Sequence, residues 1–231
     1  MNLTTIYDIL FNGKTLSLPK EEMECVCQCH DFLREFVADK IIYGINTGFG
    51  PMAQWRVDDT HLRELQYNII RSHSTGAGKP LSDVEVKSAM LARIGTFLQA
   101  RSGIHASIII LLQEFVNRGI FPFIPQHGSV GASGDLVQLA HMALCLIGEG
   151  KVHYKGNWRP TKDVMDEEGL KPIGIYVREG LSICNGTSVM TGISVVNQYY
   201  AENLLRYATI AGAWINEIAD SFDDYMSVEE N

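Results

Sequence analysis

The chain contains 231 residues, of which 46% are hydrophobic and 20% are charged. This composition is typical of globular proteins and excludes a disordered or fibrous chain. A net charge of -8 argues against nucleic acid as a partner. The longest apolar run, around 108–112, is far shorter than the ~20 residues of a membrane span. The first ten residues lack the pattern of a secretory signal, so we expect a soluble cytoplasmic protein.

The five cysteines do not predict a disulfide framework, because their number is odd. Three of them, Cys25, Cys27 and Cys29, directly precede His30. On a helix Cys25 and Cys29 share one face while Cys27 points elsewhere, and the C-x-x-C spacing of zinc sites is absent. We therefore predict a thiol-rich helix at this position and no metal site.

Helices separated by a glycine-rich loop are predicted for the first third of the chain. Apolar residues at helical spacing predict a helix over 20–38. Residues 41–55 then form a β-branched stub that opens into a loop with three glycines and a proline. The helical pattern returns over 63–74 and is broken at 76–80.

A capping box marks the start of the next helix. Ser82 and Glu85 have the required spacing, and we expect this helix to run to about Arg101. Its apolar positions form one stripe, which consists of Val86, Met90, Ile94, Phe97 and Leu98. A further helix over 108–118 is stopped by Gly119.

The second half of the chain alternates extended and helical patterns. An extended segment over 122–125 leads into a glycine-rich loop, and a helix is predicted over 136–147. Residues 151–160 predict a small hairpin that turns at Lys155-Gly156-Asn157, followed by a polar stretch to about residue 172. The architecture is therefore mainly α.

Residues 187–222 form one long helical pattern that is apolar around most of its circumference. At ~1.5 Å per residue this helix would exceed roughly 45 Å, which is too long for a small domain on its own. Such a helix needs partners to bury its surface, either in a larger protein or in an oligomer.

The most unusual local feature is the sequence GSVGASGD at residues 128–135. It is not a nucleophile elbow, because Asp135 stands where G-x-S-x-G needs glycine. Its glycine spacing does not fit a dinucleotide-binding loop, and no clear strand precedes it. The nearby GAGKP is not a phosphate-binding loop either, since Pro80 follows the lysine and His73 replaces the upstream glycine.

What remains is a tight loop of small residues that leads into a helix N-terminus. If the loop is bent hard, the backbone nitrogen of Gly134 is able to attack the carbonyl carbon of Ala132. Loss of water there, and of the Ser133 hydroxyl, closes a five-membered ring with an electrophilic methylene. The helix dipole then favours negative charge that develops on the ring. The alternative interpretation is a glycine-rich turn capped by Asp135.

The GSVGASGDL motif, with YGINTGFGP before it and EGLSICNGTS after it, resembles the aromatic amino acid ammonia-lyase family. This family includes histidine, tyrosine and phenylalanine lyases and related aminomutases, and the resemblance runs from about residue 40 to residue 231. It implies that Ala132, Ser133 and Gly134 cyclise to the prosthetic group 4-methylidene-imidazol-5-one (MIO). Asp135 then stands at the position that assists cyclisation.

The resemblance also assigns roles outside the cyclising loop. Tyr43 corresponds to the base that takes the β-proton, and Asn185 to the residue that holds the ring and the substrate. A free tyrosine has a pKa of ~10, so a base at this position needs nearby donors or positive potential. Without the other motifs, Tyr43 is better interpreted as a packed loop aromatic and Asn185 as a helix cap before Thr187.

Substrate choice is left open by these motifs. His73 lies where the family has its selectivity dipeptide, and Gly50 falls among the implied substrate-binding residues. A histidine hydrogen-bonds either an imidazole or a phenol, so tyrosine and histidine both remain candidates. Val137-Gln138 replaces the Ala-Pro of most family members and resembles a bacterial tyrosine-lyase branch. A tyrosine 2,3-aminomutase is the alternative within the class.

The resemblance implies the long-helix bundle of the ammonia-lyase (fumarase/aspartase-like) type, with a small irregular and β N-terminal part and a short hairpin. We expect a MIO-containing domain over 1–186 and the truncated start of the central bundle over 187–231. Family chains are longer and form homotetramers whose active sites combine several subunits. A catalytically inert fragment that only assembles is therefore the competing hypothesis, and no metal or nucleotide cofactor is implied.

Overall fold

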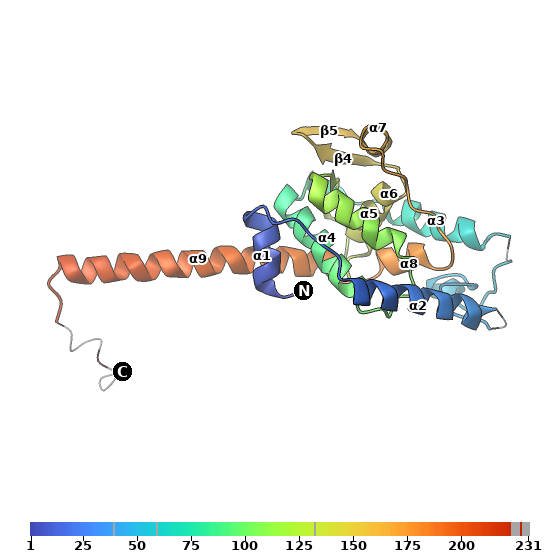
Figure 1. The fold of residues 1–231 in the computed structure, drawn as a ribbon, viewed down its shortest axis with the longest axis horizontal. Coiled ribbons are helices and arrows are strands. Elements are labelled where there is room, and N and C mark those ends of the chain that lie inside the picture. Colours follow the sequence, from blue (N-terminus) through green and yellow to red (C-terminus); the bar gives the residue numbers. More distant parts are fainter. Residues whose placement is uncertain (39, 59, 132, 223–226, 228–231) are drawn as a thin grey trace. The chain divides into compact units, whose positions relative to one another are not determined.

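The computed structural model describes residues 1–231 except 39, 59, 132, 223–226 and 228–231. The fold is mainly α-helical (Figure 1), with helices α1 (Leu3–Phe11), α2 (Lys20–Val37), α3 (Leu62–His73), α4 (Asp83–Phe97), α5 (Ser107–Arg118), α6 (Leu136–Leu146), α7 (Thr161–Glu167), α8 (Glu179–Cys184) and α9 (Ser188–Ile218). A 3-10 turn, η1 (Gly50–Met52), lies in the glycine-rich loop.

Short antiparallel strands flank the helices. The strands are β1 (Ala77–Pro80), β2 (Phe121–Pro122), β3 (Pro125–His127), β4 (Lys151–Tyr154) and β5 (Asn157–Pro160). One sheet pairs β1 with β3, and a three-stranded sheet has the order β2-β4-β5. The β4–β5 hairpin lies beside α7 (Figure 1), with which both strands are in contact.

The contacts divide the chain into two compact units, residues 1–193 and residues 194–231. The first unit holds the apolar core, and the second contains the larger part of α9. The boundary therefore lies inside a helix, and the predicted domains over 1–186 and 187–231 stay a prediction.

Helix α4 forms the centre of the core. The predicted stripe is buried at four positions and half-buried at Leu98, and it packs with α5 and α6 around Phe115 and Leu139. Ser88 and Leu91, which lie on the other side of the helix, are also buried, so α4 is enclosed on more than its apolar face. The sequence pattern predicted the stripe but not the burial of the opposite side.

Several helix ends agree with the sequence signals. The capping box is present, with the Ser82 N–H donating to Glu85 Oε2 at 2.8 Å and the Glu85 N–H donating to Ser82 Oγ at 3.4 Å. Helix α5 ends at Gly119, whose φ of 66° is left-handed. In contrast, α4 ends at Phe97 rather than near Arg101, because the chain turns away over the next residues.

One expectation for the irregular segments was wrong. The stub at 41–42 is not a strand, since the buried Asn46 side chain binds the Ile42 N–H at 2.7 Å and the Lys40 carbonyl at 2.6 Å. Those polar groups are therefore satisfied inside a turn. The helical pattern is broken at 76–80 as predicted, and the break contains strand β1, which pairs with β3.

The polar stretch after the hairpin contains a helix that the sequence analysis missed. Val164 and Met165 of α7 are fully buried, so a short apolar pair is enough to fix the helix onto the hairpin. The hairpin itself is confirmed. Tyr154 pairs with Asn157, which leaves Lys155 and Gly156 as the turn, with φ values of 48° and 79°. Positive φ at both positions is the pattern of a type I′ turn.

Candidate active site

The glycine-rich loop before α6 lies against the segment that follows α8. Gly134 and Gly186 form a parallel bridge, and the Asp135 N–H donates to the Gly186 carbonyl at 2.7 Å. Gly134 has a φ of 79°, and a Cβ at this position would collide with the Gly186 carbonyl oxygen. Only glycine fits here, because the two backbones approach too closely for a side chain.

Asp135 occupies the N-cap position of α6, but its side chain does not cap that helix. The Asp135 Oδ2 instead accepts a hydrogen bond from the Met190 N–H at 2.8 Å, in the first turn of α9. At the start of α6 the Val137 N–H instead donates a hydrogen bond to the Ser129 hydroxyl at 3.3 Å. Asp135 therefore connects the start of α6 to the start of α9, and its side chain does not cap α6.

Asn185 is the C-cap of α8, and its N–H donates to the Leu181 carbonyl at 3.0 Å. Its carbonyl accepts from Arg93 Nη2 at 2.8 Å, and the Ser182 carbonyl accepts from the same nitrogen. Burial lowers the pKa of Arg93 to about 10, and the negative charge of Asp135 opposes that shift. Burial likewise raises the pKa of the adjacent Cys184 thiol to about 12, so this neighbour is neutral at pH 7.

The start of α8 is linked to the loop around Tyr43 by the buried side chain of Gln66. Its Nε2 donates to the Gly44 carbonyl at 2.9 Å, and its Oε1 accepts from the Leu181 N–H at 3.0 Å. One amide on α3 therefore satisfies a loop carbonyl and a helix N–H together. Gly44 is also tightly enclosed, since a Cβ there would collide with Leu181.

Tyr43 itself is exposed, with 51% of its surface accessible. Its hydroxyl oxygen accepts a hydrogen bond from the Gly50 N–H at 3.2 Å, and its ring meets Phe49 edge-on at 6.4 Å. A backbone donor on this oxygen is the type of partner that a tyrosinate base needs. Gly50, predicted to bind substrate, thus contacts the predicted base.

His73 lies in the last turn of α3 and is half-buried. Its Nδ1 lies 2.9 Å from the Ile69 carbonyl, so this nitrogen is the donor and Nε2 is left as an acceptor. Within the described residues, no hydrogen bond joins His73 or Tyr43 to the loop at 133–135.

The structure thus brings together only some of the predicted residues. Gly134 and Asp135 meet Gly186, directly after Asn185, whereas the loop that carries Tyr43 is connected through Gln66 to the Leu181 N–H in α8. Ser133 and Asn185 are both exposed, and Ala132 lies outside the described residues. The sequence analysis missed Arg93 and Gln66. Each is a polar residue beside apolar helix positions, and this pattern alone does not distinguish a buried side chain from a solvated one.

Comparison with known proteins places this arrangement in a family. The chain matches the family model of aromatic amino acid lyases over residues 1–229. The chain belongs to the aromatic amino acid lyase family. It is 44% identical over 214 residues to a tyrosine 2,3-aminomutase from Chondromyces crocatus, covering 92% of this chain and 40% of the aminomutase. It is 38% identical to a histidine ammonia-lyase from Salmonella paratyphi B, covering 94% of this chain and 43% of that protein.

Solved structures of the aromatic amino acid lyase family have the same fold. A histidine ammonia-lyase from Trypanosoma cruzi superposes with a TM-score of 0.88 at 29% identity, covering 97% of this chain and 44% of that protein. A phenylalanine aminomutase from Pantoea agglomerans gives a TM-score of 0.85 at 32% identity, covering 90% of this chain and 40% of that one. The chain thus spans about two fifths of the length of these relatives.

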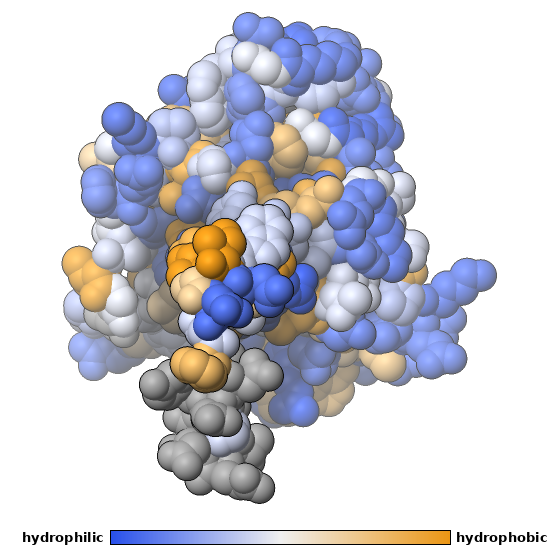
Figure 2. Space-filling model, turned by 90° about the vertical axis from the view of Figure 1, so that its left-hand side faces the viewer, coloured by the Kyte–Doolittle hydropathy of each residue, from blue (hydrophilic) through white to orange (hydrophobic). Residues whose placement is uncertain are grey.

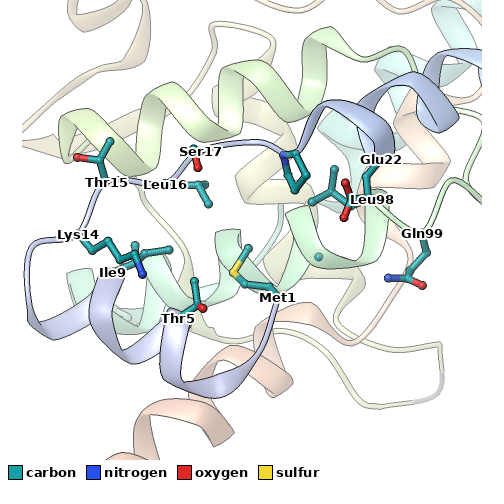
Figure 3. Close-up of a pocket in the computed structure, with 12 residues that line it drawn as sticks. Met1, Thr5, Ile9, Lys14, Thr15, Leu16, Ser17, Glu22, Leu98 and Gln99 are labelled. Atoms are coloured by element: carbon teal, nitrogen blue, oxygen red, sulfur yellow. The ribbon is translucent and has the colours of Figure 1, made fainter.

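Other features of this lyase-family chain lie apart from the motifs. Figure 3 shows a pocket of about 220 Å³ between α1, the end of α4 and the segment between α1 and α2, and none of its lining residues belongs to the three motifs. In the described part of the chain, no group of three or more His, Cys, Asp or Glu side chains is placed to hold a metal ion. Cys25 and Cys27 are exposed on α2, and Cys29 is half-buried. Among the described residues, no helix is both long and apolar enough to cross a membrane.

Proposed function

We propose that this chain is the electrophile-forming part of an enzyme that removes ammonia from L-tyrosine or L-histidine to give the trans-α,β-unsaturated acid. One observation carries the proposal: the Gly134–Asp135 backbone pairs with Gly186, directly after Asn185. Two motifs about fifty residues apart therefore meet at the loop whose residue types permit cyclisation. Membership of the aromatic amino acid lyase family supports this chemistry.

The residues present fit the MIO group. Gly134 has the positive φ and the side-chain-free backbone that a hard bend requires, and the Ser133 side chain is exposed where a substrate has access to it. Asp135 follows directly and is anchored to α9. Once formed, MIO supplies an electrophilic methylene carbon for the substrate amine.

Roles for the remaining motif residues follow from the same resemblance. Tyr43 takes the β-proton of the substrate, and the Gly50 N–H orients its hydroxyl oxygen. Asn185 holds the substrate from a backbone that Arg93 fixes on its carbonyl side. His73 presents Nε2 as an acceptor, which suits a phenol O–H or an imidazole N–H, so both substrates stay in the proposal.

A tyrosine 2,3-aminomutase is the second candidate, because the relative at 44% identity carries that name. Both reactions begin by removing the amine, and the mutase returns it to the β-carbon. Product analysis with L-tyrosine separates them. Accumulation of coumarate supports the lyase, and accumulation of a β-amino acid supports the mutase.

We also propose that the chain functions in a cytoplasmic homotetramer. The second unit exposes large apolar side chains at helical spacing, and Figure 2 shows such side chains open to the outside beside hydrophilic ones. The residues concerned are Leu204, Leu205, Tyr207, Trp214, Ile215 and Ile218. An exposed apolar surface of this kind favours burial against further helices. An inert fragment that only assembles would expose the same residues, so assembly alone does not establish catalysis.

An accurate intact mass of the purified chain tests the proposal. A species two waters lighter than the sequence mass is expected if the 132–134 tripeptide cyclises. Ser133→Ala removes the hydroxyl that leaves as the second water, so this variant should lose at most one water, and its fold should be unchanged. The full sequence mass in the wild-type chain contradicts the electrophile-forming role and favours the inert fragment.

A further inference from the structure

Arg93 carries a buried charge that has no direct ionic partner. The side chain lies on α4 and only 2% of the residue is exposed. In the part of the chain that the structure describes, no carboxylate lies within ion-pair distance of it. Its Nη2 donates to the carbonyls of Ser182 and Asn185, and its Nη1 to the Ser188 hydroxyl at 3.4 Å.

Packing alone does not account for a guanidinium at this place. Burial of a charge is costly, and an apolar residue of similar size is often as stable or more stable. The planar fork of arginine does what an apolar side chain cannot, because Nη2 joins two carbonyls at the end of α8 while Nη1 donates to the Ser188 hydroxyl at the start of α9. These carbonyls have no partner further along the helix, and a cation at a helix C-terminus also meets its negative dipole end.

Gly186 lies between this guanidinium and the cyclising loop. A Cβ on Gly186 would collide with Arg93 Nη1, and a Cβ on Gly134 would collide with the Gly186 carbonyl. The same carbonyl accepts the Asp135 N–H at 2.7 Å. The contacts form three layers: the guanidinium, the Gly186 backbone and the Gly134–Asp135 backbone. A shift of the first layer therefore displaces the third.

We propose that Arg93 is a positioning residue that fixes the Asn185–Gly186 backbone and thereby holds Gly134 in the bent conformation that cyclisation needs. Its consequence for cyclisation rests on the function proposed above. In that step a bond forms between the Gly134 nitrogen and the carbonyl carbon of residue 132. The carbonyl oxygen leaves as water with the amide hydrogens of Ser133 and Gly134. The Ser133 hydroxyl leaves with the α-hydrogen as the second water.

Two variants of the 231-residue chain test the role of the Arg93 guanidinium. Arg93→Met keeps most of the stem and removes the donors, whereas Arg93→Lys keeps the charge and one nitrogen but lacks the second nitrogen, which donates to the Ser188 hydroxyl. Lys87→Met is the matched control, because Lys87 lies on the same helix and its ammonium donates to the Ile9 carbonyl at 2.7 Å, away from α8. Each variant is examined by intact mass, thermal unfolding and hydrogen exchange at the Asp135 amide.

We expect the Asp135 amide of Arg93→Met to exchange about tenfold faster than in the wild-type chain, which corresponds to one local hydrogen bond. The fraction of chains that have lost two waters should fall in the same variant. Arg93→Lys should lie between it and the wild type, and Lys87→Met should match the wild type in both readouts. A residue with only a structural role would lower the unfolding temperature without a selective change at Asp135.

The proposal is overturned if Arg93→Met retains the wild-type exchange rate at Asp135. If the wild-type chain cyclises and Arg93→Met loses two waters to the same extent, the consequence for cyclisation is overturned. If the wild-type chain has its full sequence mass, the proposed function fails, and the exchange measurement still decides the positioning role. Should Arg93→Met not fold, the same comparison is made with Arg93→Lys, for which a wild-type exchange rate also overturns the proposal.

Discussion

The segment around Asn185 and the loop around Tyr43 both carry candidate catalytic residues, but the core holds them differently. The segment is fixed from three sides, by Arg93 on its carbonyls, by Gln66 on the Leu181 N–H and by the Asp135 N–H on Gly186. The loop is attached to α3 by the bond from Gln66 to the Gly44 carbonyl, and Tyr43 stays exposed.

This difference corresponds to two different requirements of an active site. A backbone that has to stay bent for an internal condensation needs many fixed contacts, because each lost contact lets the loop relax. A base that meets an entering substrate lies instead on a segment with fewer contacts, where local opening costs less free energy. Both halves lie within residues 1–193, and the loop around Tyr43 is joined to α8 by the Gln66 amide and by the close packing of Gly44 against Leu181.

The largest effect on stability is expected at the contact between the Gly134 backbone and the Gly186 backbone. Gly134→Ala forces a Cβ with positive φ into the Gly186 carbonyl, and we expect a loss of more than ~3 kcal/mol in the free energy of unfolding. Gly131→Ala is the matched control in the same loop. Its φ is 73° but no atom lies within 4 Å of the added carbon, so ~1 kcal/mol is expected. Denaturant unfolding measures both, and equal losses would show that the contact with Gly186 is not tight.

Removal of the shared amide should have the next largest effect. Gln66→Met leaves the Gly44 carbonyl and the Leu181 N–H buried without their partner, and we expect a loss of ~2–4 kcal/mol. Gln113→Met serves as the control. The Gln113 amide donates to the Leu16 carbonyl at 2.9 Å, and the Asn117 amide also donates to that oxygen, so ~1 kcal/mol or less is expected. If Gln66→Met loses no more free energy of unfolding than Gln113→Met, the proposed role of the Gln66 amide is contradicted.

The sequence predicted the elements whose signals are local. The capping box at Ser82, the helix stop at Gly119 and the hairpin over 151–160 each depend on residues close together in the chain, and all three are present. The helix α7 was missed, because two buried residues in a polar stretch do not produce a visible period.

The site was predictable only as a set of motifs. Arg93 and Gln66 hold it together through contacts with residues 89 to 115 positions away, and no spacing rule indicates such partners. In the alternative interpretation the side chain of Asp135 caps its own turn, but it binds α9 through the Met190 N–H. In each case the partner is determined by tertiary packing, so the local sequence pattern does not predict which residue the side chain contacts.

A smaller effect on stability is expected when the pH is lowered. Burial lowers the pKa of His141, whose Nε2 accepts the Gly76 N–H at 3.2 Å next to β1. The unfolded chain therefore takes up this proton first as the pH falls below ~6.5, so stability should decrease from there until the lower folded pKa is reached. His141→Gln keeps an acceptor but does not titrate, and its stability should depend less steeply on pH. Urea unfolding between about pH 7 and about pH 5.5 measures this, and parallel curves for the two proteins would contradict it.

The smallest structural effect is expected at Tyr43. Tyr43→Phe removes one exposed hydroxyl that accepts a single bond from the Gly50 N–H, so the free energy of unfolding should change by less than ~0.5 kcal/mol. The water loss at residues 132–134 should be unchanged, since no described bond joins Tyr43 to that loop. In the complete enzyme, however, turnover should fall by at least ~100-fold if Tyr43 takes the β-proton. A variant that fails to lose water would show that the two halves of the site depend on each other, and one that retains turnover would exclude Tyr43 as the base.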